Sequence, residues 1–477
     1  MSRNPLRSIP SISELLESPQ LHTLVDKISH NVVVTTARNV LDEIRTEIQT
    51  AASEKTLPSV SDLAERIAKR VVEGEVPSLR PVINATGILL HTGLGRAPLA
   101  EEVIEELIAV ARDYASVEVD LHSGERSQRK VAVENLLREL TGAEAAMVVN
   151  NNAGATLLAL AAMAQGREVI VSRGQLIEIG GSFRLPEVMA ASGAVLREVG
   201  TTNKTRAEDY ADAITDAAAA LMLVHPSNFR IVGFSSTATL AELVELGRRR
   251  HLPVIHDIGS GAMIDFEQFG FQDEPIASQS IKTGADIVLL SGDKLLGGPQ
   301  CGIILGRKTL VEQIERHPLA RALRVDKLTL GALAATLRLY RDPQKAQRSI
   351  PLLQLLGTSV ENLQNRAERL APQIDATAVI EKAEAVAGST FLGGGSIPTQ
   401  ELATWCISVK PAHGSVDRLA AVLRTASPPV VGRIQQDRLL LDLRSVLPRQ
   451  DAQLVAAIDA IGKEAAEENN SSDIAAE

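Results

Sequence analysis

The decisive stretch of this 477-residue chain reads Leu289-Leu290-Ser291-Gly292-Asp293-Lys294-Leu295-Leu296-Gly297-Gly298-Pro299-Gln300. One lysine ends an apolar run there, and a glycine-rich turn follows at once. A lysine that forms a Schiff base with an aldehyde must be held rigidly and partly removed from water. The end of a strand before a turn of small residues provides both conditions. We therefore predict that Lys294 is a Schiff-base lysine and that Ser291 adds a hydroxyl beside it.

A second apolar run ends in an acid and reads Leu252-Pro253-Val254-Ile255-His256-Asp257, before a loop that contains two glycines. Pyridoxal 5'-phosphate is an aldehyde cofactor that attaches to lysine, and a carboxylate at its ring nitrogen keeps that nitrogen protonated. The protonated ring then accepts electrons from a carbanion at the α-carbon of an amino acid. Asp257 is the predicted carboxylate.

Two further apolar runs supply the remaining parts of such a site. One ends at Val224, and Asn228 follows it closely enough for its amide to donate to the phenolic oxygen of the cofactor. The other ends at Val149 and continues into a polar turn and a helix-like segment. Because free backbone N–H groups and the helix dipole attract phosphate at such a turn, we expect the phosphate to meet Asn151, Asn152 and Ala153.

Each signal is weak alone, since an acid at a strand end is usually a cap or turn residue and an Asn-rich turn usually caps a helix. Their order is more informative: anion turn, Asn, Asp and Lys each close an apolar strand in an alternating strand–helix pattern. Aminotransferase-like (fold type I) pyridoxal phosphate enzymes use this order. The predicted fold class is therefore α/β with a mostly parallel sheet.

Composition divides the chain into four parts. We expect a small helical N-terminal domain, a large cofactor-binding α/β domain, a smaller α/β C-terminal domain and a polar, disordered tail, at residues 1–75, 76–344, 345–463 and 464–477. Within the first part, Arg66, Lys69 and Arg70 are spaced to lie near one another on a helix. They form either a phosphate-facing patch or an ordinary solvated helix face.

Charge and composition exclude several classes of protein. A net charge of −10 and 2% aromatic residues argue against a whole-surface nucleic-acid binder. The two cysteines are too few for a disulfide framework or a four-ligand zinc site, and we expect no metal. No apolar run approaches the ~20 residues of a membrane span, and the N-terminus lacks a secretory signal, so we expect a cytoplasmic protein.

Long blocks of the chain resemble the bacterial selenocysteine synthase family, L-seryl-tRNA(Sec) selenium transferase. The blocks cover nearly the whole chain and include Ile83-Asn84-Ala85-Thr86-Gly87, His91-Thr92-Gly93-Leu94-Gly95-Arg96, Glu198-Val199-Gly200-Thr201-Thr202-Asn203, His225-Pro226-Ser227-Asn228-Phe229-Arg230 and His317-Pro318-Leu319-Ala320-Arg321-Ala322-Leu323-Arg324.

The resemblance implies that the protein converts L-seryl-tRNA(Sec) to L-selenocysteinyl-tRNA(Sec), with selenophosphate as donor and through a cofactor-bound aminoacrylyl intermediate. It also implies a homodecamer and an N-terminal domain that binds tRNA. Lys294 would carry the pyridoxal 5'-phosphate. An anion-binding cluster would comprise Arg96, Arg129, Arg321 and Arg324, with Arg126 a lesser candidate. Arginine suits this task because its charge is permanent and its donors are planar, although each arginine alone is more often a structural ion-pair partner.

Two positions depart from the family pattern. Gly93 stands where the family usually has Asn, and His256 is less usual before the acid, which leaves the details of substrate recognition open. Two alternatives remain. One is a related β-eliminating lyase that acts on a small amino acid or amino-sugar acid without tRNA; the other is a tRNA-binding scaffold without catalysis. The helical N-terminal segment counts against the former, and the Asn228, Asp257 and Lys294 set counts against the latter.

Overall fold

The computed structural model describes residues 9–50, 58–179, 183–393 and 396–474. Its internal contacts form two compact units, Met1–Pro81 and Val82–Glu477. The division falls at Pro81 and not at residue 75, where we had placed it. The last helix of the first unit ends at Glu75, and a short non-helical segment follows it within the same unit.

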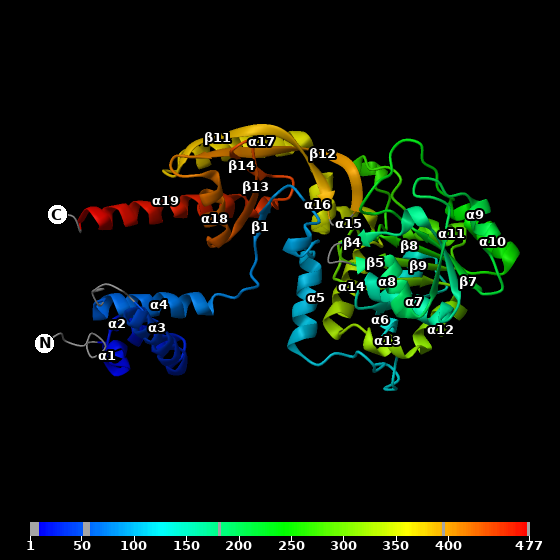
Figure 1. Cartoon of the computed structure of the whole chain (residues 1–477), viewed down its shortest axis with the longest axis horizontal. Helices are drawn as coiled ribbons and strands as arrows, with labels where there is room; N and C mark the ends of the chain where they lie inside the picture. The colour runs from blue at the N-terminus through cyan, green and yellow to red at the C-terminus, as the bar shows by residue number, and fades with distance from the viewer. Residues whose placement is uncertain (1–8, 51–57, 180–182, 394–395, 475–477) are drawn as a thin grey trace. The chain divides into compact units, whose positions relative to one another are not determined.

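The first unit is helical (Figure 1). Serine side chains begin three of its helices: Ser11, Ser18 and Ser59 each accept a hydrogen bond from a backbone N–H of the first turn. Apolar residues at helical spacing then face one another and form a core of their own. The helices are α1 (Ile12–Leu16), α2 (Pro19–Lys27), α3 (His30–Thr50) and α4 (Val60–Glu75).

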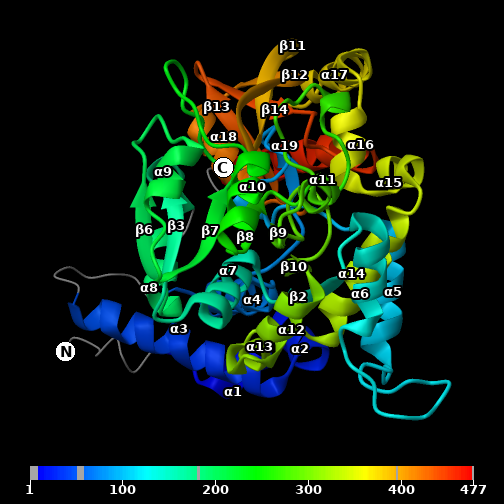
Figure 2. The same ribbon diagram turned by 90° about the vertical axis from the view of Figure 1, so that its right-hand side faces the viewer.

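The second unit is built on a seven-stranded sheet with strand order β2-β10-β9-β8-β7-β3-β6 (Figure 2). Only β10 runs antiparallel to its neighbours. The predicted α/β class with a mostly parallel sheet is therefore confirmed. The strands are β2 (Ala145–Val149), β3 (Glu168–Ser172), β6 (Val195–Val199), β7 (Ala218–Val224), β8 (Val254–Gly259), β9 (Ile287–Ser291) and β10 (Gly302–Gly306).

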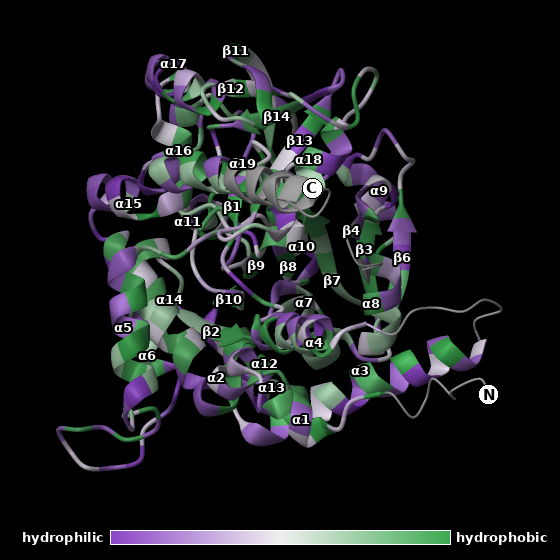
Figure 3. Ribbon diagram, turned by 90° about the vertical axis from the view of Figure 1, so that its left-hand side faces the viewer, coloured by the Kyte–Doolittle hydropathy of each residue, from purple (hydrophilic) through white to green (hydrophobic). Residues whose placement is uncertain are grey.

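Helices cover both faces of this sheet, which explains why its central strands are continuous apolar runs (Figure 3). Side chains of α7, α8 and α12 pack in the core cluster on one face, and those of α6, α10 and α11 pack in the clusters on the other. The helices between residues 101 and 339 are α5 (Glu101–Arg112), α6 (Val131–Thr141), α7 (Asn152–Ala164), α8 (Leu185–Ser192), α9 (Ala207–Asp212), α10 (Leu240–Arg250), α11 (Ala277–Thr283), α12 (Lys308–Arg316), α13 (Pro318–Ala322) and α14 (Lys327–Leu339).

A second sheet has the order β1-β13-β14-β12-β11. Its strand β1 (Ile83–Ala85) pairs in parallel with β13 and shares a core with it, although we had assigned those residues to the large domain. This sheet therefore joins residues 83–85 to strands that begin at residue 380. The sequence did not predict this pairing, because strand pairing across such a separation leaves no local pattern. The other elements are β11 (Ile380–Gly393), β12 (Ser396–Pro411), β13 (Val430–Gln435), β14 (Arg438–Asp442), α15 (Pro343–Ser349), α16 (Pro351–Gly357), α17 (Val360–Asp375) and α18 (Val416–Thr425).

The final helix α19 (Asp451–Ile474) corrects another expectation. We predicted disorder from residue 464, but the backbone stays helical to Ile474. The physical reason is local, since Lys463-Glu464-Ala465-Ala466-Glu467-Glu468 consists of strong helix formers. Throughout the described part of the chain, no helix combines the length and apolar character needed to cross a membrane.

Candidate active site

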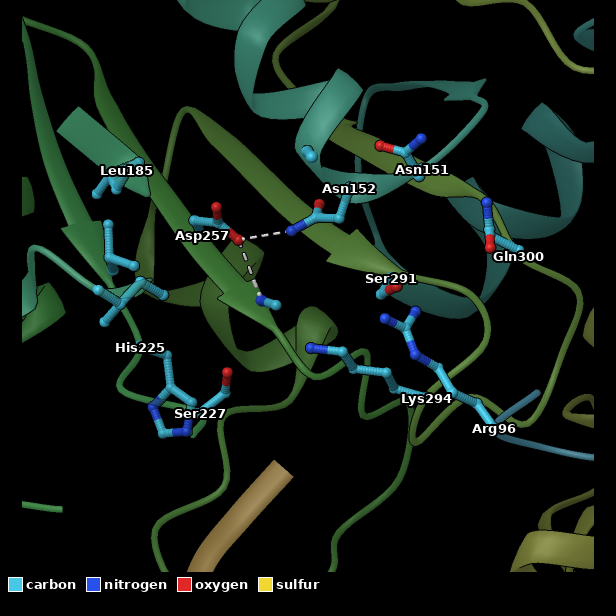
Figure 4. Close-up of a pocket in the computed structure, with 14 residues that line it drawn as sticks. Arg96, Asn151, Asn152, Leu185, His225, Ser227, Asp257, Ser291, Lys294 and Gln300 are labelled. Carbon is cyan, nitrogen blue, oxygen red and sulfur yellow. Dashed lines mark hydrogen bonds between the residues drawn. The ribbon is translucent and has the colours of Figure 1, made fainter. Parts of the chain in front are cut away.

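A cavity of about 240 Å³ opens beside the carboxyl ends of the parallel strands (Figure 4). Ligands bind at this edge in open α/β sheets because the loops that leave the strands converge there. Residues at the ends of β2, β7, β8 and β9, or just beyond them, all reach it. The lining residues are Arg96, Asn151, Asn152, Ala153, Ile177, Leu185, Val224, His225, Ser227, Asp257, Gly259, Ser291, Lys294 and Gln300.

Lys294 lies just after β9, and its side chain reaches into the cavity beside Arg96 (Figure 4). Only 5% of the residue is exposed. Burial lowers the pKa of its ammonium group, and the nearby Arg96 charge lowers it further, while Asp257 and Asp293 act in the opposite direction. A lowered pKa increases the neutral amine, which is the form that attacks an aldehyde or takes a proton.

Asp257 lies on β8 and is held by three hydrogen bonds. The Asn152 amide and the Gly259 N–H donate to Oδ1 at 3.0 and 3.1 Å, and the Thr156 hydroxyl donates to Oδ2 at 3.0 Å. Burial raises the pKa of this carboxyl, and the hydrogen bonds oppose that effect. A buried carboxylate of this kind gains from a cation placed in the cavity, such as a protonated ring nitrogen.

The turn predicted to bind the cofactor phosphate, Asn151 to Ala153, forms the start of α7. Asn151 caps this helix, and its Oδ1 accepts a hydrogen bond from the Gly154 N–H at 2.8 Å. Asn152 and Ala153 occupy the first helical positions, where N–H groups have no partner within the helix. Asn152 Oδ1 is also buried without a hydrogen-bond partner among the described residues. The free N–H groups fit a bound phosphate, whereas the Asn152 oxygen is an acceptor and would need a donor group of a ligand.

Arg96 is oriented by an acid to which the sequence analysis gave no role. Its guanidinium lies 2.7 Å from Asp293 Oδ2, and the Ser291 hydroxyl donates to Asp293 Oδ1 at 2.8 Å. The Arg96 backbone has φ 64°, a left-handed conformation that is uncommon for arginine. The Ser291 hydroxyl is thus engaged with Asp293, next to the lysine, while still lining the cavity.

The family of the chain can now be assigned. A family model described as L-seryl-tRNA selenium transferase matches residues 82–447, and one described as Selenocysteine synthase N terminal matches residues 6–45. The chain belongs to the L-seryl-tRNA(Sec) selenium transferase family.

Two relatives carrying that name illustrate the similarity. The protein of Moorella thermoacetica is 49% identical over 460 residues, which cover 96% of this chain and 97% of the relative. The protein of Carboxydothermus hydrogenoformans is 44% identical, with 93% and 95% covered. Among solved structures, D-glucosaminate-6-phosphate ammonia-lyase matches with a TM-score of 0.53 and 22% identity, over 81% of this chain and 97% of that one, and shows the shared fold.

The four arginines that the family resemblance implies do not line one cavity in this chain. Arg96 lines the cavity of Lys294, whereas Arg129 and Arg324 line a separate hollow of about 480 Å³. Arg129 pairs there with Glu118 at 2.9 Å. Arg321 lies on α13 and lines neither space.

Arg126 and Asn228 also lie apart from the cavity. Arg126 is strongly exposed and pairs with Glu118 at 3.3 Å. The Asn228 amide donates to the Glu178 carbonyl at 2.7 Å, so the structure does not bring it to the position predicted for the phenolic oxygen donor. The backbone turns after Ser227, and the preceding His225 and Ser227 line the cavity instead.

Sequence analysis missed Thr156, His225, Ser227 and Gln300. Thr156 carried a usable signal, because it follows Asn152 by one helical turn and therefore lies on the same face of α7. His225 directly follows β7 and could have been found as a polar residue at a strand end. Ser227 and Gln300 reach the cavity only through the path of their loops.

The two departures from the family pattern have different surroundings. His256 points away from the cavity, as alternation along a strand requires for a neighbour of Asp257. Its Nδ1 lies 3.1 Å from the Ser280 hydroxyl, and burial lowers its pKa to about 3. A side chain at Gly93 would begin 3.3 Å from Cε1 of His91, whose Nδ1 is buried without a partner in the described chain. Because this position is Gly and not Asn, it offers no side-chain amide that could form a hydrogen bond with Nδ1 of His91.

The basic patch of the first unit is paired with acids. Glu43 lies 3.2 Å from Arg66 and 2.6 Å from Arg70, and all three side chains are about half exposed. The Arg70 guanidinium lowers the pKa of the Glu43 carboxyl. Such pairing is typical of a solvated helix face, and it partly neutralises the arginines that a phosphate would meet.

Proposed function

We propose that this protein converts L-seryl-tRNA(Sec) to L-selenocysteinyl-tRNA(Sec), with selenophosphate as selenium donor and pyridoxal 5'-phosphate as cofactor. One observation carries the proposal: a buried lysine, a buried aspartate and an open helix start line a single cavity in a chain of this family. The lyase alternative has less support, since its structural counterpart is only 22% identical, whereas the transferase relative is 49% identical over 96% of the chain.

The cavity residues would hold the cofactor in a defined way. Lys294 would be the point of attachment, Asp257 would face the ring nitrogen, and the N–H groups of Asn152 and Ala153 would meet the phosphate. When bound, the cofactor supplies an electron sink for the α-carbon of the seryl group.

Lys294 would also move the reacting proton. With its pKa lowered by burial, its Nζ is available in the neutral form to take the α-proton of the seryl group. Asp257 would keep a positive charge at the ring nitrogen, because Asn152 and Thr156 hold its carboxylate in place. The β-hydroxyl would then leave as water after gaining a proton, and the selenium of selenophosphate would bond to the β-carbon while the α-carbon regains a proton. Hydrolysis of the selenium–phosphorus bond would release phosphate and leave the selenol.

Arg96 would hold the selenium donor. Its guanidinium lines the cavity and keeps a fixed direction through Asp293, so a phosphate-like anion would meet a permanently charged, planar donor. Arg129 and Arg324 line another hollow, and Arg321 lines neither, so a neighbouring subunit would have to supply them if all four act together. We propose a homo-oligomer for this reason, with a decamer implied by the resemblance.

The first unit would contact the tRNA. Its support is the match of residues 6–45 to the N-terminal family model and the presence of Lys69 beside the paired arginines. We propose that the reaction takes place in the cytoplasm, where aminoacylated tRNA is available.

The direct test is incubation of purified protein with seryl-tRNA(Sec), selenophosphate and pyridoxal 5'-phosphate, followed by mass analysis of the aminoacyl product. The parent protein and a Lys282→Ala control, which removes an exposed lysine on α11, should yield selenocysteine. Lys294→Ala should yield only serine and should lose the borohydride-sensitive absorbance band near ~420 nm. Recovery of serine alone from the parent protein would refute the proposed function.

A further inference from the structure

Behind the cavity lies a buried carboxylate, Glu274, that the proposed reaction does not use. Its side chain is only 3% exposed. It comes from the loop between the short helix η4 (Glu267–Phe269) and α11, and not from a strand that forms the site. A carboxylate is seldom buried without charged or hydrogen-bonding partners, because desolvation strongly penalises it.

The two oxygens of Glu274 contact two different parts of the site. Oε2 lies 3.5 Å from Nε2 of His225, which lines the cavity and is 19% exposed. Oε1 accepts a hydrogen bond from the Ser260 hydroxyl. The Ser260 carbonyl in turn accepts the backbone N–H of Leu295 at 2.9 Å, one residue after Lys294.

We propose that Glu274 is a positioning residue that orients the His225 imidazole in the cavity wall and ties this wall to the Lys294 loop through Ser260. A carboxylate 3.5 Å from Nε2 favours the ring tautomer that carries a proton on that nitrogen, which sets the orientation that the imidazole presents to a bound ligand. His225 is further fixed by its backbone N–H, which donates to the Asp257 carbonyl at 2.8 Å. One acid outside the cavity thereby contacts both His225, which lines the cavity, and Ser260, whose carbonyl holds the loop just after Lys294.

The first test needs no cofactor. Diethyl pyrocarbonate attacks imidazole nitrogens that carry no proton, and peptide mass mapping reports its rate at each histidine. Glu274→Gln keeps the size of the side chain and an acceptor for Ser260 but removes the charge facing His225. Carbethoxylation of His225 should become about fivefold faster, as expected for loss of a partly buried pair, and it should be unchanged in Glu267→Gln, which alters an exposed acid nearby.

The second test rests on the proposed function and uses a double-mutant cycle on the affinity for pyridoxal 5'-phosphate. Glu274→Gln should weaken binding about fivefold in the parent protein and have no effect in His225→Asn, because an effect transmitted through the imidazole disappears with it. A merely structural role would weaken binding equally in both backgrounds and would overturn the proposal.

The two tests separate the two proposals. A parent protein that binds no cofactor would refute the proposed function, while the carbethoxylation rates would still decide the His225–Glu274 pair. An unchanged rate at His225 in Glu274→Gln would overturn the inference. Should that variant fail to fold, Ser260→Ala removes only the hydroxyl that holds the same carboxylate. It should raise the rate about twofold, and an unchanged rate would again overturn the inference.

Discussion

Two charged side chains are buried in the Lys294 cavity, whereas the Glu43–Arg70 pair in the helices of the first unit is half exposed. In the cavity, Lys294 and Asp257 are almost fully buried, and burial is the largest influence on the pKa of each. In the first unit, Glu43 and Arg70 are paired and half exposed, so water and salt screen their interaction. The comparison shows that the two proposed catalytic groups, Lys294 and Asp257, differ from the surface ion pairs in one respect. Their removal from water shifts their pKa values, and neighbouring groups offset that shift only in part.

The largest effect should follow from removing the buried acid. Asp257→Asn should lower the rate of selenocysteine formation by about 10³-fold, within the range of losses on removing a single catalytic group, because a neutral amide cannot keep the ring nitrogen charged. The same variant should still form the borohydride-sensitive band, since Lys294 remains. Single-turnover assays measure the rate, and Asp216→Asn, at an exposed position, is the control. A rate close to that of the parent would remove Asp257 from the mechanism.

The next effect concerns the cavity arginine. Arg96→Ala should raise KM for selenophosphate by about 30-fold, in line with the ~2 kcal/mol of a charge-assisted hydrogen bond to an anion. Arg126→Ala, whose side chain is 86% exposed, should leave KM near the parent value. Steady-state assays with varied selenophosphate provide the measurement. Equal changes in the two variants would contradict the expected difference between an arginine that lines the cavity and one that is strongly exposed.

A smaller effect involves His256 and acid. Burial lowers the pKa of His256 to about 3 in the folded protein. Between about pH 6.5 and pH 3 the unfolded chain therefore binds a proton at this histidine and the folded chain does not. Stability should therefore be present in full above about pH 6.5 and should fall as the pH decreases toward 3, by roughly 1.4 kcal/mol per unit.

Urea unfolding at pH 7.5 and 5.0 measures this loss. The drop between these values should be smaller by about 2 kcal/mol in His256→Asn than in the parent. His413→Asn replaces an exposed histidine and should show the parent's full drop. An identical drop in His256→Asn would show that this ring is not kept neutral by the fold.

The smallest effect should appear in the first unit. Glu43→Gln removes the carboxylate paired with Arg70 and one of the two paired with Arg66, which also pairs with Glu47. The affinity for tRNA should rise about twofold at low salt because the Arg70 guanidinium becomes available to phosphate. Filter binding measures the affinity. Glu65→Gln, at an exposed position on α4, the helix that carries Arg66 and Arg70, is the control. Equal affinities for Glu43→Gln, the control and the parent would assign this patch to the solvated helix face.

Much of the cavity was predictable because its residues follow apolar strands in the chain. Lys294, Asp257 and Asn152 each stand at or just beyond a strand end, and parallel strands bring such positions together. Asn228 has the same sequence signal, yet the turn after Ser227 directs its amide to the Glu178 carbonyl. The conformation of one turn thus decides whether a polar residue faces the cavity. That conformation cannot be predicted from the residue types alone.

The sequence by itself determined the order of the strands and helices, the lysine and the carboxylate of the site, and the family of the chain, because each depends on residue types at fixed spacing. Only the tertiary structure decided the pairing of β1 with β13, the contact of Glu274 with His225 and the separation of Arg96 from Arg129. These features join segments far apart in sequence, and they depend on how the chain packs as a whole.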